Sequence, residues 1–191
     1  GECHFNFSIE ECEELILKHF KDVSGNLYNM TKQAFDEKWI DYPTRPGKQP
    51  GAFCENLSWI KQSRLITNYN NTLSDIITVA HELGHAFHGM MIENQPVLNR
   101  DYCMPLAETA STFNENIMYN ALQKDMNDHD KLLVIDSQLS ALCQNILDIY
   151  ARFQFETLVF EHVEEGFLTA NQLCELMKEA LLRSFGDGLD P

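Results

Sequence analysis

Apolar residues spaced three and four positions apart recur along most of this chain, and they constrain it to a mainly helical fold. Two segments, Ser8–Glu11 and Thr169–Gln172, have the pattern of a capping box that opens a helix. Further helices are expected over 26–40, 72–91 and 105–124. The longest periodic segment is expected to bury one stripe in the core, formed by Leu132, Ile135, Leu139, Leu142, Ile146, Ile149 and Phe153.

A loop rich in proline and glycine separates the second predicted helix from two strand candidates. Segment 41–51 contains three prolines and two glycines, which excludes a regular helix there. The following segments 52–54 and 65–69 are short, apolar and partly β-branched, as strands are. The sequence therefore predicts a single domain over 1–191, mainly α with a small β-sheet. The helix stop near its end leads to no further element, so we expect the chain to be a fragment of a longer protein.

Composition argues against two classes of partner. Of 191 residues, 14 are Lys or Arg and 29 are Asp or Glu, giving a formal net charge of −15. Nucleic-acid affinity comes mostly from neutralising phosphates with Lys and Arg, so we expect no nucleic-acid partner. No apolar run approaches the ~20 residues that a membrane span needs, and no signal-peptide pattern lies near residue 1, so we expect no membrane partner.

The cysteines do not have the spacing of a disulfide framework or of a close metal-ligand pair. A chain of this length does not need disulfides to compensate for a small core. We therefore expect most of them to be free, buried thiols in a reducing compartment, and the protein to be cytoplasmic. The six are Cys3, Cys12, Cys54, Cys103, Cys143 and Cys174.

One segment, His81–His85 with the sequence HELGH, combines two histidines and a glutamate at the spacing of a zinc site. Residues four apart share a helix face, so the imidazoles of His81 and His85 can converge on one ion, and nitrogen donors suit Zn²⁺. Glu82 points about 100° away around the helix, where it can take a proton from water that the metal activates. The motif therefore predicts a metal, a nucleophile and a general base.

A zinc peptidase site needs a third protein ligand and an open fourth position. Glu108 and Glu115 are seven residues apart, hence on one face of the predicted helix over 105–124. Because helical rise separates them by about 10 Å, one ion cannot easily bind both. Spacing favours Glu108 as the ligand and Glu115 as an outer residue that orients a histidine, with the reverse assignment left open.

Three segments in order resemble oligoendopeptidase F, a family of the thimet-oligopeptidase-like zinc peptidases: 45–54, 81–88 and 108–115. The similarity extends to Tyr150–Phe153 and to the closing helix. The resemblance implies a helical, zincin-type catalytic core that cleaves short oligopeptides inside a deep channel. It implies one Zn²⁺ ion on His81, His85 and Glu108, with Glu82 as general base.

The resemblance also implies regions that this chain lacks. Members of the family are about three times longer, and beyond the point that matches Pro191 they carry a segment with Tyr and His that is thought to stabilise the oxyanion. Oxyanion stabilisation is often worth several kcal/mol, so we expect the fragment to bind metal but to be weak or inactive alone. The alternatives are a non-catalytic zinc- or peptide-binding module and a zinc carboxypeptidase with a similar motif.

For two other groups of residues the sequence leaves more than one structural role open. His88 shares a face with His81 and His85, and it is expected to line the cleft or support a ligand rather than to be the third ligand. Gly51, Ala52 and Phe53 either belong to an ordinary core strand or, as the resemblance suggests, to an edge strand that hydrogen-bonds an extended substrate.

Overall fold

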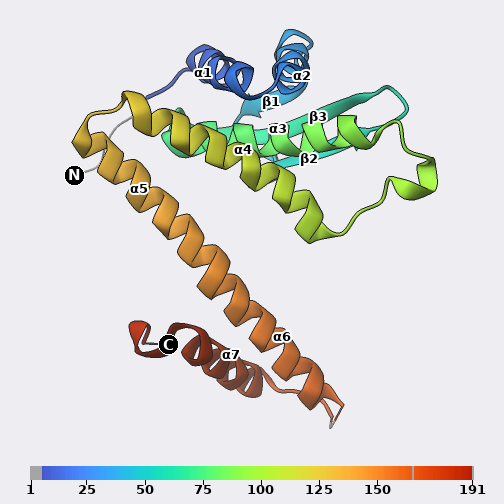
Figure 1. The fold of residues 1–191 in the computed structure, drawn as a ribbon. Coiled ribbons are helices and arrows are strands. Elements are labelled where there is room, and N and C mark those ends of the chain that lie inside the picture. Colours follow the sequence, from blue (N-terminus) through green and yellow to red (C-terminus); the bar gives the residue numbers. More distant parts are fainter. Residues whose placement is uncertain (1–5, 165, 191) are drawn as a thin grey trace. The chain divides into compact units, whose positions relative to one another are not determined.

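The computed structural model describes residues 6–164 and 166–190. Contacts divide the chain into two compact units, 1–130 and 131–191. The first unit contains α1 to α4 and a three-stranded sheet, the second contains α6 and α7, and α5 runs across the boundary (Figure 1). The expected mainly α fold with a small sheet is confirmed.

The first two helices begin at serines that cap them. The capping box of α1 (Ile9–Val23) is confirmed, since Ser8 Oγ accepts from the Glu11 amide and Glu11 Oε2 accepts from the Ser8 amide. Ser24 caps α2 (Gly25–Asp36) in the same way, through the amide of the third helical residue. The buried faces of the two helices supply much of the core of the first unit, with Cys12, Ile16, Phe20, Leu27 and Met30.

The sheet has three strands in the order β1–β3–β2. The strand β1 (Ile40–Pro43) runs parallel to β3 (Gln62–Tyr69), while β2 (Phe53–Leu57) is antiparallel to β3 and forms a hairpin with it. Both expected strands are present but longer than the apolar segments that predicted them. Among the described residues β2 pairs only with β3, so one edge of β2 is free.

The expectation of a helix over 26–40 is wrong at the C-terminal end of that range. The helix stops at Asp36, because Lys38 has a left-handed backbone with φ of 57°. Ile40 lies instead in β1, opposite Leu65 of the central strand. Local periodicity could not separate these states, since pairing with a strand 25 residues away decides the conformation of Ile40.

The helices α3 (Leu73–Ile92) and α4 (Met104–Asp125) pack against each other, and α3 also packs against the sheet. A capping box at Thr72 begins α3, in agreement with the helix expected over 72–91, and Pro105 lies in the first turn of α4. Gly84 is buried where the two helices meet. A Cβ at this position would lie 2.7 Å from both Ala110 O and Ser111 Cα, so only glycine allows this backbone contact.

The second unit is helical throughout its regular structure. The end of α5 (Asp128–Cys143) continues through a π-helical turn, 144–148, into α6 (Ile149–Val163), and α7 (Ala170–Phe185) packs on α6. The capping box at Thr169 is confirmed, and α7 ends at Gly186, where φ is 59°. A small core holds the pair together, formed by Leu158, Leu176 and Ala180 with Phe155, Val159 and Leu168.

The stripe predicted as core is exposed in this chain, which corrects that expectation. All seven of its residues, from Leu132 to Phe153, are between 39% and 66% exposed. Periodicity identifies which residues share a face, but it does not say whether anything covers that face. Residues 128–163 are also the one stretch in the described part of the chain that is long and apolar enough to cross a membrane. The polar residues Asp136, Gln144 and Asp148 lie within it.

The expectation of free thiols fits the structure, but that of burial does not. The five cysteines in the described ranges are unpaired, and Cys3 lies outside those ranges. Cys12 is buried and Cys54 is half-buried, while Cys103, Cys143 and Cys174 are exposed. Neighbouring apolar residues therefore predicted burial poorly for the exposed cysteines.

Candidate metal centre

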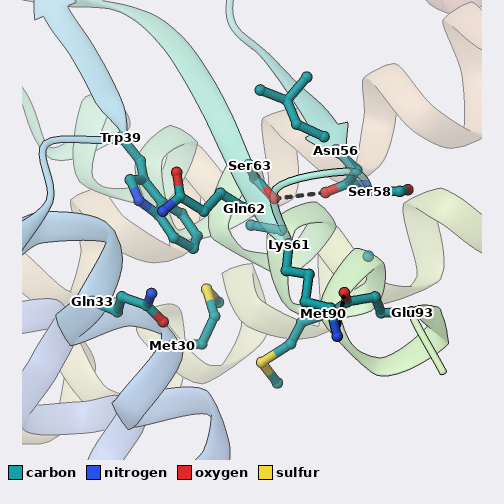
Figure 2. A pocket seen from close by; sticks show the side chains of 13 residues that line it. Met30, Gln33, Trp39, Asn56, Ser58, Lys61, Gln62, Ser63, Met90 and Glu93 are labelled. Atoms are coloured by element: carbon teal, nitrogen blue, oxygen red, sulfur yellow. Dashed lines mark hydrogen bonds and ion pairs between the residues drawn. The ribbon is translucent and has the colours of Figure 1, made fainter.

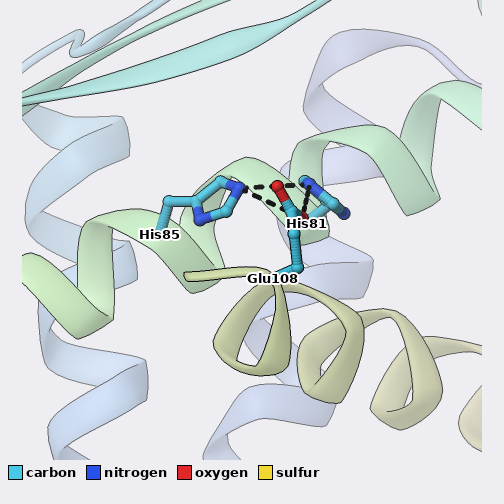
Figure 3. A group of neighbouring side chains, drawn as sticks. All are labelled: His81, His85 and Glu108. Carbon is cyan, nitrogen blue, oxygen red and sulfur yellow. Dashed lines mark hydrogen bonds and ion pairs between the residues drawn. The ribbon is translucent and has the colours of Figure 1, made fainter. Parts of the chain in front are cut away.

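His81 and His85 stand one turn apart on α3, and their rings converge (Figure 3). The two Nε2 atoms are 3.2 Å apart, and the rings meet edge to face with centroids 4.8 Å apart. This follows from the spacing of four residues on a helix whose start is fixed by the Thr72 cap. The sequence motif therefore does bring two nitrogen donors to one point.

Glu108 lies on the first turns of α4 and reaches both histidines (Figure 3). Its Oε2 is 3.3 Å from His81 Nε2 and 3.7 Å from His85 Nε2. Donors that surround zinc tetrahedrally at about 2.0–2.1 Å lie about 3.3 Å from one another. The three donors therefore match three corners of such a site. Within the described ranges they are the only cluster of His, Cys, Asp or Glu side chains that could hold a metal ion.

Glu115 contacts the far side of the His81 ring. Its Oε1 lies 2.5 Å from His81 Nδ1, so Nε2 is the ring nitrogen left facing Glu108 and His85. Burial lowers the pKa of His81, but the bond to Glu115 and the negative charges of Glu82, Glu115 and Glu108 outweigh burial and raise it. Burial and the charge of His81 lower the pKa of His85. Glu108 and Glu115 thus occupy the places that spacing favoured for them.

Glu82 is buried beside the cluster, at 4% exposure, and its Oε2 has no hydrogen-bond partner. Burial, with a smaller contribution from the charge of Glu108, raises the pKa of Glu82 to about 7, and His81 opposes this shift. A buried carboxylate oxygen without a hydrogen-bond partner is unfavourable unless a ligand or a water molecule binds to it. Its position and its pKa suit a group that accepts and releases a proton near neutral pH.

The edge strand β2 packs against α3. Burial, and then the charge of Glu82, raise the pKa of the Cys54 thiol to about 12. Phe53 begins β2 opposite Ile66, whereas Gly51 and Ala52 precede the strand. Gly51 has a φ of 86°, and its carbonyl accepts a hydrogen bond from Asn68.

His88 does not join the donor cluster. Its ring stacks on Tyr102, with centroids 4.3 Å apart, and its buried Nδ1 has no hydrogen-bond partner. His88 is thus not placed as a third ligand, and its role in lining a cleft or supporting a ligand stays a prediction. Tyr102 precedes α4 and was not singled out from the sequence, because no spacing rule connects it with α3.

Ser111 is a second neighbour of the cluster that the sequence did not single out. It is fully buried on α4, and its hydroxyl lies 2.8 Å from Glu108 Oε2 and 3.0 Å from Glu108 O. Its position three residues after Glu108 could have indicated a shared face. Serine is common in helices, however, so this signal is weak by itself.

A small cavity lies beside the β2–β3 hairpin and contains none of the cluster residues in its lining (Figure 2). Its volume of about 40 Å³ has room for water but not for a peptide. On its wall Ser63 Oγ donates to Asn56 Oδ1 over 2.7 Å, and a Cβ at Gly89 would overlap the Asn56 side chain. This cavity therefore belongs to the packing of β2 on α3.

Comparison with known proteins finds relatives that match nearly the whole chain. The model of Peptidase family M3 matches residues 5–187. An oligoendopeptidase F homolog of Lactococcus lactis subsp. lactis (strain IL1403) is 32% identical over 183 residues, which cover 94% of this chain and 28% of the relative. The chromosomal oligoendopeptidase F of Lactococcus lactis subsp. cremoris is 32% identical over 188 residues, which cover 95% and 30%.

The fold has a counterpart among solved structures. A crystal structure from Bacillus anthracis str. Ames, assigned to oligoendopeptidase F, has a TM-score of 0.80 at 16% identity, over 98% of this chain and 33% of that one. The resemblance to oligoendopeptidase F is therefore confirmed. The chain spans less than a third of the length of the two curated relatives.

Proposed function

The chain belongs to peptidase family M3, and from this premise we propose that it is the zinc-binding core of a metallo-endopeptidase that hydrolyses short oligopeptides. The observation that carries the proposal is the donor triangle of His81, His85 and Glu108, with separations of 3.2, 3.3 and 3.7 Å. These values are those of three corners of a tetrahedral zinc site. The name oligoendopeptidase F, which both curated relatives carry, supports internal cleavage of oligopeptides.

In this proposal the two histidines and Glu108 hold one Zn²⁺ ion, which when bound supplies Lewis acidity toward water and toward a peptide carbonyl. Glu82 accepts a proton from the attacking water, since its buried Oε2 has no other partner. The same carboxyl then returns the proton to the leaving amine. Glu115 holds the His81 ring through Nδ1 and keeps Nε2 directed at the ion.

The proposed substrate lies along the free edge of β2. An extended peptide can add to such an edge through main-chain hydrogen bonds, and specificity then comes from pockets for alternate side chains. The packing of β2 on α3 supports this placement, because a peptide paired with β2 would run beside the helix that carries the general base. Phe53 belongs to this edge, with Gly51 and Ala52 leading into it.

We propose that the chain alone binds zinc but hydrolyses peptides weakly. It spans 28% and 30% of the length of its two curated relatives. The resemblance puts the channel wall and the oxyanion-stabilising segment in regions outside this span, and oxyanion donors are often worth several kcal/mol. We also propose a cytoplasmic location. The unpaired state of the five cysteines within the described residues supports it, and cell fractionation would check it.

The decisive experiment separates metal binding from proton transfer. Zinc titration of the 191-residue chain should give one ion per chain, and His81→Ala should abolish this binding. Glu82→Gln should keep zinc, yet in the complete enzyme it should lower cleavage of an end-blocked oligopeptide by about 10²–10⁴-fold. Full activity in Glu82→Gln would remove Glu82 from the mechanism. Cleavage restricted to peptides with a free carboxyl terminus would indicate a carboxypeptidase instead.

A further inference from the structure

Ser111 is placed to act on the centre through Glu108. The Ser111 hydroxyl is fully buried and lies 2.8 Å from Glu108 Oε2, closer than the 3.0 Å to the Glu108 carbonyl oxygen. The same Oε2 is the atom that faces His81 Nε2 at 3.3 Å and His85 Nε2 at 3.7 Å. One carboxylate oxygen therefore meets the hydroxyl on one side and both histidines on the other.

The chemistry of a carboxylate allows both contacts at once. Each oxygen has two lone pairs, so an oxygen that accepts a hydrogen bond from serine keeps a lone pair for a cation. Glutamate otherwise has three rotatable bonds, and fixing them costs side-chain entropy each time the ligand set is assembled. A hydrogen bond that is already present in the protein lowers this cost.

Ser111 itself has little freedom to move. Its Cα lies 2.7 Å from the point where a Cβ on Gly84 would stand, so α3 closes over this turn of α4. One turn further along, the buried Asn114 donates to Ala80 O of α3 over 3.3 Å. The hydroxyl is thus carried by backbone that is fixed against the helix bearing the two histidines.

We propose that Ser111 is a positioning residue of the metal centre: its hydroxyl holds the Glu108 carboxylate in the orientation that binds the ion. The inference rests on the proposed metal centre and adds to it a residue outside the ligand set. It concerns metal affinity, so its test does not depend on peptidase activity.

A neighbouring residue provides a matched control. Serine and threonine in helices commonly donate to a carbonyl one turn back, and Thr112 does only this, with Oγ1 lying 2.7 Å from Glu108 O and 3.5 Å from Thr109 O. Thr112→Ala removes a hydroxyl from the same turn without touching the carboxylate. Ser111→Ala removes the hydroxyl that contacts Glu108 Oε2.

The experiment measures zinc affinity by competition with a chromophoric chelator, together with the melting temperature of the metal-free chain. Ser111→Ala is expected to weaken zinc binding by about 10-fold or more, as loss of an outer partner of a metal ligand does. Thr112→Ala is expected to bind zinc like the parent. The metal-free melting temperatures of the two variants should be similar, since each loses one helix hydroxyl.

A double substitution makes the test specific to Glu108. In a Glu108→Ala background, adding Ser111→Ala should leave the residual zinc affinity unchanged, because the carboxylate through which Ser111 acts is gone. Parent-like affinity in Ser111→Ala, or an equal loss in the Glu108→Ala background, would overturn the inference while the metal centre stands. A parent chain that binds no zinc would instead overturn the proposed centre and the inference with it.

Discussion

Gly84 lets the backbones of α3 and α4 touch, and this contact sets the distance between the two sources of donors. The histidines belong to α3 and Glu108 to α4, so any increase in the helix separation moves the carboxylate away from the imidazoles. A mid-helix glycine costs up to about 1 kcal/mol relative to alanine. At this position the close approach of the helices compensates for that cost.

Gly84→Ala should destabilise the first unit and weaken zinc binding. The new Cβ would meet two backbone atoms, Ala110 O and Ser111 Cα, which cannot turn aside as a flexible side chain can. Overpacking of this kind costs about 1–3 kcal/mol, and the better helix propensity of alanine returns up to about 1 kcal/mol. Urea denaturation followed by tryptophan fluorescence measures the effect in this unit, because Trp39 and Trp59 both lie in it.

Gly25→Ala is the matched control. A Cβ at Gly25 would have nothing within 4 Å, and its backbone is compatible with alanine. The control should therefore be neutral or slightly stabilising. Equal stability and zinc affinity in Gly84→Ala and the parent would show that the helices can separate without consequence.

For single residues, the sequence predicts the candidate metal donors better than it predicts the residues that contact them. The two histidines follow from helical geometry alone, and the placement of Glu108 and Glu115 required only that the second helix pack on the first. Tyr102 could not be assigned in advance, since its contact with His88 depends on how the segment before α4 packs on α3. Ser111 had only the weak signal of its spacing of three residues from Glu108.

Among the elements, the loop 44–51 is fixed by ionic contacts with the end of β1. Arg45 donates from two guanidinium nitrogens to the two carboxylate oxygens of Asp41, each over 2.7 Å. The ammonium of Lys48, whose side chain is only 2% exposed, donates to Asp41 O and Pro43 O. These bonds hold a segment that prolines and glycines exclude from regular structure, and that leads directly into β2.

The contribution of Asp41 to stability should depend on pH. The hydrogen bonds from Arg45, opposed by burial and aided by Lys48, lower the pKa of Asp41 from 3.8 to about 2. A carboxyl whose pKa is lower in the folded state stabilises it fully above the unfolded pKa, and this stabilisation disappears as pH falls through the folded pKa. The gap in unfolding free energy between the parent and Asp41→Asn should therefore be constant above pH about 4 and shrink toward pH about 2.

Urea denaturation of both proteins at several pH values measures this gap. Asp36→Asn is the comparison, because its ion pair with Lys32 joins side chains that are 61% and 49% exposed and should contribute little. A gap for Asp41→Asn that is the same at pH 3 and pH 6 would contradict the assignment.

The sequence predicted well the helices whose starts depend on local capping residues. It predicted poorly the strands, which depend on pairing with distant parts of the chain. The capping boxes at Ser8 and Thr169 gave two helix starts within one residue. The strand β1 was missed because its four residues begin soon after the end of α2 and are stabilised by a partner strand that comes later in the chain. Strand length was underestimated for the same reason.

At the scale of the whole molecule, a row of apolar side chains along α5, the turn 144–148 and α6 remains in contact with solvent. The seven residues of the row include Leu139 at 55% and Ile146 at 65% exposure. Contiguous apolar surface of this kind favours association in water. The sequence predicted the row itself, but burial is a property of what surrounds a helix and could not be predicted from its period.

Substituting this row should change association rather than folding. The pair Leu139→Glu and Ile146→Glu should reduce self-association of the isolated chain, measured by sedimentation velocity, with helical content by circular dichroism unchanged. The pair Ser137→Glu and Gln144→Glu adds the same charge at exposed polar positions of the same helical stretch and serves as the control. Loss of helical content in the first pair alone would mean that the row is already buried in solution.

The division of the donors between two helices has a kinetic consequence for any ion that binds at this site. His81 and His85 already face each other once α3 has formed, so this single helix is a bidentate chelator before the rest of the unit is in place. Glu108 joins only when α4 docks, 23 positions further along the chain from His85. Binding of the ion should therefore proceed in two stages. The ion first binds weakly and reversibly to the two histidines, and docking of α4 then adds Glu108 and slows dissociation. Release of the metal should require α4 to separate from α3.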